Sequence, residues 1–150
     1  MTLVFTLDDE NGMLFNSRRQ TRDVVMRHSL MALVQKGNGR IWMSKYSSKL
    51  FGPEINGSTV LLLEENDFEK DAKENDCVFV EDVDVPVLPE DTLVIYRWNT
   101  IYPSDKRFTV DLSKYDAICS WDFEGKSHPA ITCTIYRHLE RRVLRDEKDS

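Results

Sequence analysis

Short apolar runs alternate with one long amphipathic segment through the first half of the sequence, and this alternation restricts the fold more than any other feature. Residues 2–7 form the first run, which turn residues end. From a cap at Asn16 or Ser17, apolar side chains recur at helical spacing to about Lys36. Strands separated by helical or loop connections predict a mostly parallel sheet. The further apolar runs cover residues 40–44, 58–63, 77–80 and 92–98.

The sequence closes with two long β-rich runs. Residues 115–123 and 130–138 are separated by a turn-rich segment, which is typical of an antiparallel hairpin. We therefore predict one three-layer α/β domain over residues 1–138, with a central mixed sheet that is mostly parallel and ends in a C-terminal antiparallel hairpin. Residues 139–150 form a charged tail that we expect to be helical at best.

Size and composition are those of a single folded domain. A chain of 150 residues with 41% hydrophobic residues can bury one sizeable core. No apolar run approaches the roughly 20 residues that a membrane-spanning helix needs. The sequence starts without a basic leader or cleavage site, and its three cysteines lack Cys-x-x-Cys spacing. We therefore expect a reducing, cytoplasmic location.

The net charge of −6 conceals a division along the chain. Between residues 16 and 50, eight Lys or Arg side chains stand against the single acid Asp23. Between residues 64 and 91, twelve acids stand against two lysines. The acidic total argues against a nucleic-acid partner. The two segments are expected either to attract ligands of opposite charge or to attract each other.

Motifs for well-known chemistry are absent or incomplete. Neither common phosphate-binding glycine loop occurs. The histidines at 28, 128 and 138 lack metal-site spacing, so we expect no metal and assign these rings structural or surface positions. The cysteines at 77, 119 and 133 are expected to be small buried side chains. Tyr96, Trp98 and Tyr102 alternate on a predicted strand, where they either stack a heteroaromatic ring or pack within the sheet.

Three segments share their order and parts of their motifs with one known family. They are residues 4–13 (VFTLDDENGM), 41–51 (IWMSKYSSKLF) and 105–115 (DKRFTVDLSKY). The first segment resembles the first strand of the dihydrofolate reductase family and the Asn-Gly-hydrophobic turn after it. The second resembles that family's apolar-apolar-Met-Gly-Arg-x-Thr run. The third resembles its Asp-Thr-x-Phe-Pro-x-Ile-Asp-x-x-x-Trp passage. The resemblance covers most of residues 2–138 and implies the fold of that family.

The resemblance also implies a position for a catalytic acid. The family's single acidic residue, which helps to protonate the pterin, lies early in the first helix, where Asp23 is the only carboxylate. Neighbouring arginines should keep Asp23 ionised, because nearby positive charge favours the charged form. An intrahelical charge pair with Arg19 or Arg27 is the alternative role for this residue.

A cofactor site is implied in the same way. Ser44, Lys45 and Ser47 match the family's positions for the NADPH phosphates, and a solvated helix cap is the alternative. Where the family has Gly-Gly after a later strand, this chain has Glu81 and Asp82. Two carboxylates beside a diphosphate would repel it by on the order of 1 kcal/mol each.

These observations predict a divergent dihydrofolate-reductase-like domain that binds a small anionic or heteroaromatic ligand in the family's cleft. One alternative is an NADPH-dependent reductase of a pterin-like substrate, and another is a non-enzymatic interaction domain that uses the basic and acidic segments as contact surfaces. We expect a small-molecule ligand and neither a nucleic-acid nor a membrane partner, with a homo-oligomer as a further option.

Overall fold

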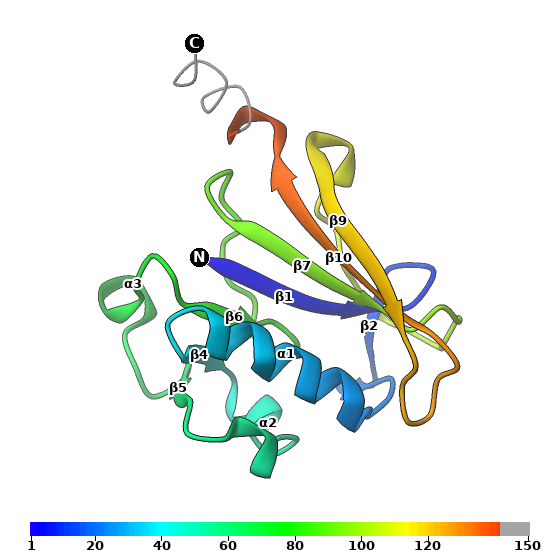
Figure 1. Cartoon of the computed structure of the whole chain (residues 1–150), viewed down its shortest axis with the longest axis horizontal. Helices are drawn as coiled ribbons and strands as arrows, with labels where there is room; N and C mark the ends of the chain where they lie inside the picture. Colours follow the sequence, from blue (N-terminus) through cyan, green and yellow to red (C-terminus); the bar gives the residue numbers. More distant parts are fainter. Residues whose placement is uncertain (142–150) are drawn as a thin grey trace.

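A seven-stranded sheet runs through the centre of the computed structural model, which describes residues 1–141 (Figure 1). The strand order is β5-β4-β6-β1-β7-β10-β9. The strands from β5 to β7 pair in parallel, and β10 pairs antiparallel with β7 and β9. The predicted fold class is confirmed. The strands are β1 (Thr2–Leu7), β4 (Arg40–Met43), β5 (Thr59–Leu62), β6 (Cys77–Phe79), β7 (Thr92–Arg97), β9 (Tyr115–Phe123) and β10 (Ile131–His138).

Helix α1 (Val24–Lys36) covers one face of the sheet. Its buried positions recur at helical spacing and pack against apolar side chains of β1, β4, β6 and β7, as expected of an amphipathic helix. The sheet is apolar on both sides: five of the six residues of β1 are buried, as expected for a parallel strand that is covered on both faces. The buried positions of α1 are Met26, Leu30, Met31 and Val34.

The helix begins at Val24, and the prediction that it begins at Asn16 or Ser17 is wrong. Asn16 and Ser17 have positive φ values of 51° and 61°. They form a two-residue turn between β2 (Gly12–Phe15) and β3 (Arg18–Arg19), which pair antiparallel. Two consecutive left-handed residues suit the twist of a tight hairpin, so the local turn replaces the first turns of the expected helix.

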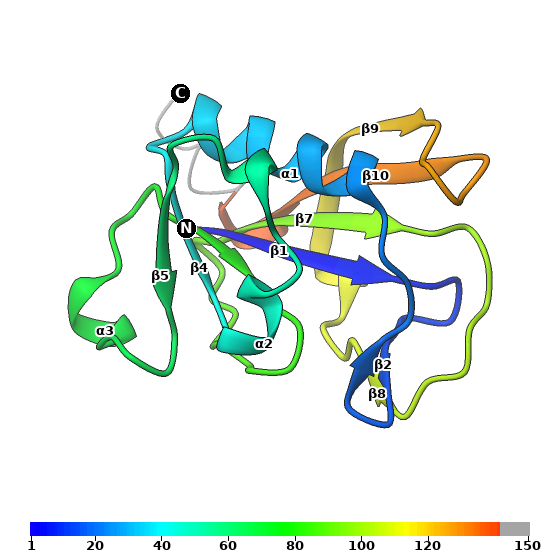
Figure 2. The same ribbon diagram turned by 90° about the horizontal axis from the view of Figure 1, so that it is seen from below.

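The opposite face is covered by connections and short elements. Figure 2 shows α1 on one side of the sheet and β2, β8 (Lys106–Arg107) and α3 (Phe68–Asp71) on the other. Side chains from these segments pack on a second apolar cluster that includes Leu3, Trp42 and Ile95. The third layer is therefore mostly irregular. The remaining short elements are α2 (Lys45–Ser48), η1 (Pro53–Ile55) and η2 (Leu112–Lys114).

Most of the predicted tail, residues 139–150, lies outside the described residues. Within residues 1–141, no helix is both long enough and apolar enough to cross a bilayer.

Candidate functional site

Polar side chains gather where the parallel strands end. Asp8 directly follows β1, Ser44 follows β4, and Glu81 lies two residues beyond β6. All three residues are buried. Ligands of open α/β sheets usually bind at the carboxyl ends of the strands, so this edge is the first place to look for a site. Buried polar groups need partners, and those partners determine what the edge can do.

Glu81 is held by one guanidinium and one hydroxyl. Arg19 donates from Nε at 3.1 Å to Oε2 and from Nη2 at 2.8 Å to Oε1, and Ser47 donates from Oγ at 2.7 Å to Oε1. The side chains of Arg19 and Glu81 are only 8% and 4% exposed. The ring of Tyr46 lies under Arg19, with the guanidinium carbon 4.2 Å from the ring centroid. The carboxylate thus occupies a preformed set of anion-binding donors.

Asp82 accepts a hydrogen bond from Ser44, the other serine that the family resemblance assigns to a cofactor phosphate. Ser44 caps α2 by accepting a hydrogen bond from the Ser47 N–H at 3.0 Å, and its Oγ donates to Asp82 Oδ1 at 2.5 Å. Lys106 Nζ donates to the Glu81 carbonyl at 2.9 Å and pairs with Asp84 at 2.8 Å. The connection after β6 is therefore held on both sides. The carboxylates of Glu81 and Asp82 bind the two serines, and the Glu81 carbonyl and Asp84 bind Lys106.

Lys45 lies apart from these serines. It is the first residue of α2, and its N–H donates to the Glu64 carboxylate at 3.0 and 3.1 Å. Its Nζ forms an ion pair of 3.2 Å with Glu65, in which both side chains are more than half exposed. The structure therefore brings Ser44 and Ser47 together and leaves Lys45 at the surface.

The basic and acidic segments bind each other. Besides Arg19 with Glu81, Arg40 forms a two-pronged contact with Asp76, at 2.8 and 3.1 Å. Burial raises the pKa of Asp76, but hydrogen bonds from Arg40, the Lys73 N–H, Trp42 and Asn38 lower it to about 2. The second of the two expectations for the divided charge, mutual attraction, therefore holds at these pairs.

Asp23 is buried at the N-terminus of α1, where it accepts hydrogen bonds from the Val25 and Met26 N–H groups at 3.0 and 3.3 Å. The turn between β9 and β10 adds the Lys126 and Ser127 N–H groups, both at 3.2 Å. The alternative role of an intrahelical pair is not found, because Arg19 pairs with Glu81 and Arg27 pairs with Glu54.

The same carboxylate contacts His128, and its environment favours the charged form. Asp23 Oδ2 lies 3.1 Å from His128 Nδ1. Burial raises the pKa of Asp23, but hydrogen bonds from His128 and from three backbone N–H groups lower it to about 2. Gly125 packs directly on this group, since a Cβ there would lie 2.6 Å from Asp23 Oδ2. Asp23 is therefore sealed by the β9–β10 turn, and its predicted catalytic role stays a prediction.

A hydrogen-bonded chain continues beyond His128. Its Nε2 lies 2.8 Å from the Tyr102 hydroxyl, and the Trp98 ring stacks on the imidazole with centroids 4.9 Å apart. His128 is 5% exposed. Sequence reasoning missed this group because Asp23 and His128 are 105 residues apart and only the closing hairpin brings them together.

The three aromatic residues predicted on one strand have separate positions. Tyr96 is fully buried in β7, its hydroxyl lies 2.8 Å from Ser29 Oγ, and burial raises the pKa of the phenol. Trp98 is buried against His128. Tyr102 lies beyond the strand, which ends at Arg97. Packing is therefore the role of Tyr96 and Trp98, and only Tyr102 reaches a cavity.

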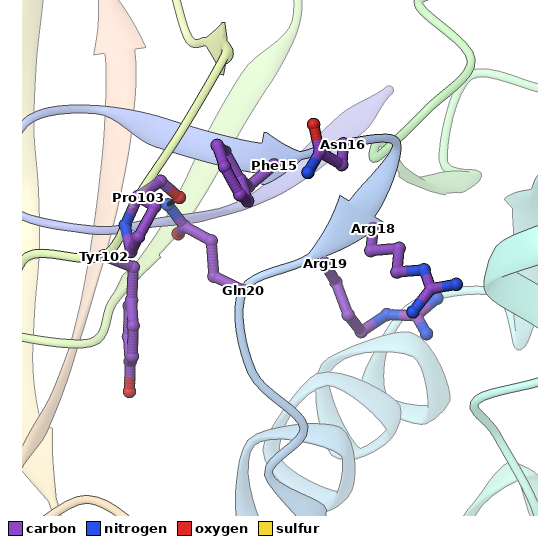
Figure 3. A pocket seen from close by; sticks show the side chains of 7 residues that line it. All are labelled: Phe15, Asn16, Arg18, Arg19, Gln20, Tyr102 and Pro103. Carbon is purple, nitrogen blue, oxygen red and sulfur yellow. Dashed lines mark hydrogen bonds between the residues drawn. The ribbon is translucent and has the colours of Figure 1, made fainter.

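That cavity has a volume of about 480 Å³ and lies between the β2–β3 hairpin and the connection after β7. Figure 3 shows the guanidinium groups of Arg18 and Arg19 on one side and the Tyr102 ring on the other. Phe15 is 43% exposed at the hairpin. Gln20 Oε1 is buried there without a hydrogen-bond partner. The lining residues are Phe15, Asn16, Arg18, Arg19, Gln20, Tyr102 and Pro103.

Two further cavities lie elsewhere. One of about 690 Å³ includes Met1, Thr2 and Cys77 in its lining, and one of about 310 Å³ lies between α1 and η1. None of the three cavities is lined by Asp23, Ser44, Lys45 or Ser47.

Two of the three cysteines are buried, as predicted, and the third is exposed. Cys77 and Cys133 are buried, and burial raises the pKa of these thiols to about 11 and about 12. Cys119 is exposed, contrary to the prediction, because β9 is the edge strand of the sheet. In residues 1–141, no group of three or more His, Cys, Asp or Glu side chains is arranged to hold a metal ion.

Comparisons with known proteins identify the fold. No family model and no curated protein sequence matches the chain. Among solved structures, it is similar to a dihydrofolate reductase from Enterococcus faecalis complexed with NADP(H) and RAB-propyl, with a TM-score of 0.55 and 11% sequence identity. The match covers 91% of this chain and 95% of that one. Likeness at this identity concerns the backbone alone. The chain thus has the fold of dihydrofolate reductase.

Proposed function

We propose that this domain binds a small anionic ligand with an aromatic or heteroaromatic ring in the cavity beside the β2–β3 hairpin, and that it does so without NADPH. The observation that carries the proposal is the pairing of Glu81 and Asp82 with Ser47 and Ser44, at 2.7 and 2.5 Å. It removes the donors that the resemblance assigns to cofactor phosphates, while the neighbouring cavity keeps a cation and an aromatic ring.

The charge of the cavity favours an anion. Arg18 is exposed and lines the cavity, and within residues 1–141 it has no ion-pair partner. Arg19 contributes less charge because Glu81 neutralises it. A guanidinium binds a carboxylate or phosphate through two parallel hydrogen bonds, and a hydrogen bond to a charged group contributes about 1.5–3 kcal/mol. Arg18 therefore supplies the recognition of charge.

The aromatic side chains favour a flat ring. Phe15 projects from the hairpin with 43% of its surface exposed, and Tyr102 forms another part of the wall (Figure 3). Stacked or edge-to-face ring pairs are worth about 0.5–1.5 kcal/mol beyond the area they bury. The unpartnered Gln20 Oε1 offers an acceptor to an N–H or O–H of the ligand.

NADPH fits this chain poorly. The hydroxyls of Ser44 and Ser47 each donate to a carboxylate of the protein, and Arg19 is held by Glu81. A diphosphate would have to displace both carboxylates and would then lie beside them at a cost of on the order of 1 kcal/mol each. These contacts weigh against the reductase alternative.

The proposal is tested by thermal unfolding with FMN, dihydrofolate and NADPH as probes. FMN or dihydrofolate at 100 times its Kd should stabilise the protein by about 2.7 kcal/mol, with no such effect of NADPH. Arg18→Gln should weaken the binding of the stabilising probe, FMN or dihydrofolate, by about tenfold or more. Lys114→Gln, a change at an exposed lysine of η2 outside the cavity, should leave affinity unchanged. The proposal fails if neither FMN nor dihydrofolate stabilises the protein, or if Arg18→Gln has no effect.

A further inference from the structure

We propose that Tyr102 is a catalytic acid–base residue in this cavity, with His128 as the group that takes its proton and Asp23 as the group that holds His128. The inference rests on the proposed function, because the cavity must first bind the anionic ligand. The observation behind it is the continuous chain from Asp23 Oδ2 to His128 Nδ1, at 3.1 Å, and from His128 Nε2 to the Tyr102 hydroxyl, at 2.8 Å.

The direction of the hydrogen bonds follows from the charge of Asp23. Its pKa is lowered to about 2, so the carboxylate is ionised near neutral pH and can only accept. The proposed chain requires the His128 tautomer that carries its proton on Nδ1 and presents a lone pair on Nε2. The Tyr102 hydroxyl then donates to Nε2. This is the order of groups in an acid–histidine–nucleophile triad, with a phenol in the third place.

The position of Tyr102 is fixed from a second direction. Its N–H donates to Asp8 Oδ2 at 3.1 Å, and the Gln20 side chain donates to the same oxygen at 3.0 Å. Burial raises the pKa of Asp8, but hydrogen bonds from Gly12, Tyr102, Glu10 and Gln20 lower it below its usual range. Two walls of the cavity are therefore tied to one buried carboxylate, which holds the phenol in place before a ligand arrives.

The surroundings of His128 favour an internal proton transfer. The imidazole is 5% exposed, and Trp98 stacks on it with an interplanar angle of 25°. Asp23 is 1% exposed. When Tyr102 gives its proton to Nε2, the imidazolium that forms lies against the Asp23 carboxylate with little solvent to screen the pair. Tyr102, the third group of the hydrogen-bonded chain, is also one of the residues that line the cavity.

The chemistry that fits is a proton shift within an anionic substrate. Tyr102 passes its proton to His128 Nε2, and the phenolate removes a proton from one atom of the substrate. The proton on Nε2 is then returned through Tyr102 to another atom of the substrate, so the protein ends as it began. Arg18 binds the anionic group of the substrate meanwhile. Such a tautomerisation consumes no oxidant, reductant or second substrate.

The test uses two probes, benzenesulfonyl fluoride and its 4-carboxy derivative. The Tyr102 oxygen attacks sulfur, an O–S bond forms, fluoride leaves, and the phenol proton goes to His128 Nε2. Peptide mass spectrometry measures the rate at Tyr102 relative to Tyr136, another half-buried tyrosine, which has no hydrogen-bond partner on its hydroxyl among the described residues. Tyr102 should react at least about tenfold faster than Tyr136, because a general base activates it.

His128→Gln separates this role from a structural one. Glutamine keeps an acceptor for the Tyr102 hydroxyl but cannot take its proton, so the ratio of rates should fall to near one. A merely structural histidine predicts the opposite change, because loosened packing exposes Tyr102 and raises its rate. Glu124→Gln, at an exposed position of the same turn, should leave the ratio unchanged.

Each outcome decides the inference. Equal rates at Tyr102 and Tyr136 in the unmodified protein, or a ratio that His128→Gln leaves unchanged or raises, would overturn it. If His128→Gln does not fold, the ¹⁵N shifts of His128 in the unmodified protein give the same decision, because a proton on Nε2 excludes the acceptor role. If the carboxylated probe modifies Tyr102 no faster than the plain probe, and the rate still depends on His128, the result supports the Tyr102 role. It then contradicts only the preference of the cavity for anions.

Discussion

The Ser47 hydroxyl donates a hydrogen bond of 2.7 Å to Glu81 Oε1, between a residue that the family resemblance assigns to a cofactor phosphate and a carboxylate of the chain itself. Arg19 binds the same carboxylate through two of its nitrogens. Glu81 therefore has the partners that an anionic ligand would have: one guanidinium and one hydroxyl. The chain has the fold of dihydrofolate reductase, and part of the carboxyl edge of its sheet is occupied by its own acids.

The Arg19–Glu81 pair should stabilise the folded chain as a unit. Arg19→Met leaves Glu81 buried without its cation, and we expect it to lower the free energy of unfolding by about 3 kcal/mol. Arg19→Met with Glu81→Gln should cost less than the sum of the single changes, by about 1 kcal/mol or more in urea unfolding. The exposed Lys45–Glu65 pair serves as the control, with a coupling below about 1 kcal/mol. Equal couplings for the two pairs would show that Glu81 is not held as described.

The ionised form of Asp23 should stabilise the fold in a defined pH range. The pKa of Asp23 is lowered to about 2 in the folded chain, so its contribution is fully present above about pH 4 and is lost as the pH falls toward 2. Asp23→Asn should therefore lower the free energy of unfolding by about 2 kcal/mol at pH 6 and by much less at pH 2. Chemical denaturation at both pH values measures the difference. A deficit of the same size at pH 2 would mean that charge is not the cause.

Gly125 should not tolerate a side chain. A Cβ at this position would lie 2.6 Å from both Asp23 Oδ2 and Ile131 Cδ1. Gly125→Ala must push the β9–β10 turn away from Asp23, and overpacking of this kind typically costs about 1–3 kcal/mol. Gly52→Ala is the matched control, because the nearest atom to its Cβ would be Glu54 Oε2 at an ordinary 3.7 Å. Thermal unfolding compares the two variants, and equal Tm values would argue against close packing on Asp23.

Local sequence signals were sufficient for the main sheet and insufficient for one turn. The order of apolar runs indicated strands near residues 2–7, 40–44, 58–63, 77–80 and 92–98, and each lies in the sheet. The sequence predicts a helix cap at Asn16 or Ser17, because both residue types cap helices well. They instead form a turn whose stability comes from the pairing of β2 with β3 and β8, which a local reading of the chain does not contain.

Predicting the site requires, even more than predicting the fold, contacts between residues that are far apart in the sequence. The spacing of Ser44 and Ser47, and the acids at 81 and 82, suggested an altered phosphate site, and the hydrogen bonds join those four residues. No local signal placed Tyr102 against His128, or His128 against Asp23. The spacing of histidines excludes a metal motif but carries no information about a ring that a hairpin delivers to a helix end.

The affinity of NADPH for Glu81→Gly with Asp82→Gly, compared with the unmodified chain, tests the central claim most directly. Removing both carboxylates frees the hydroxyls of Ser44 and Ser47 and the Arg19 guanidinium. It also removes about 2 kcal/mol of repulsion, so calorimetric titration should show binding at least about tenfold tighter than in the unmodified chain. Asp84→Asn with Glu90→Gln removes the same charge without freeing the serines and should change the affinity little. An unmodified chain that binds NADPH as tightly as the double glycine variant would contradict the account.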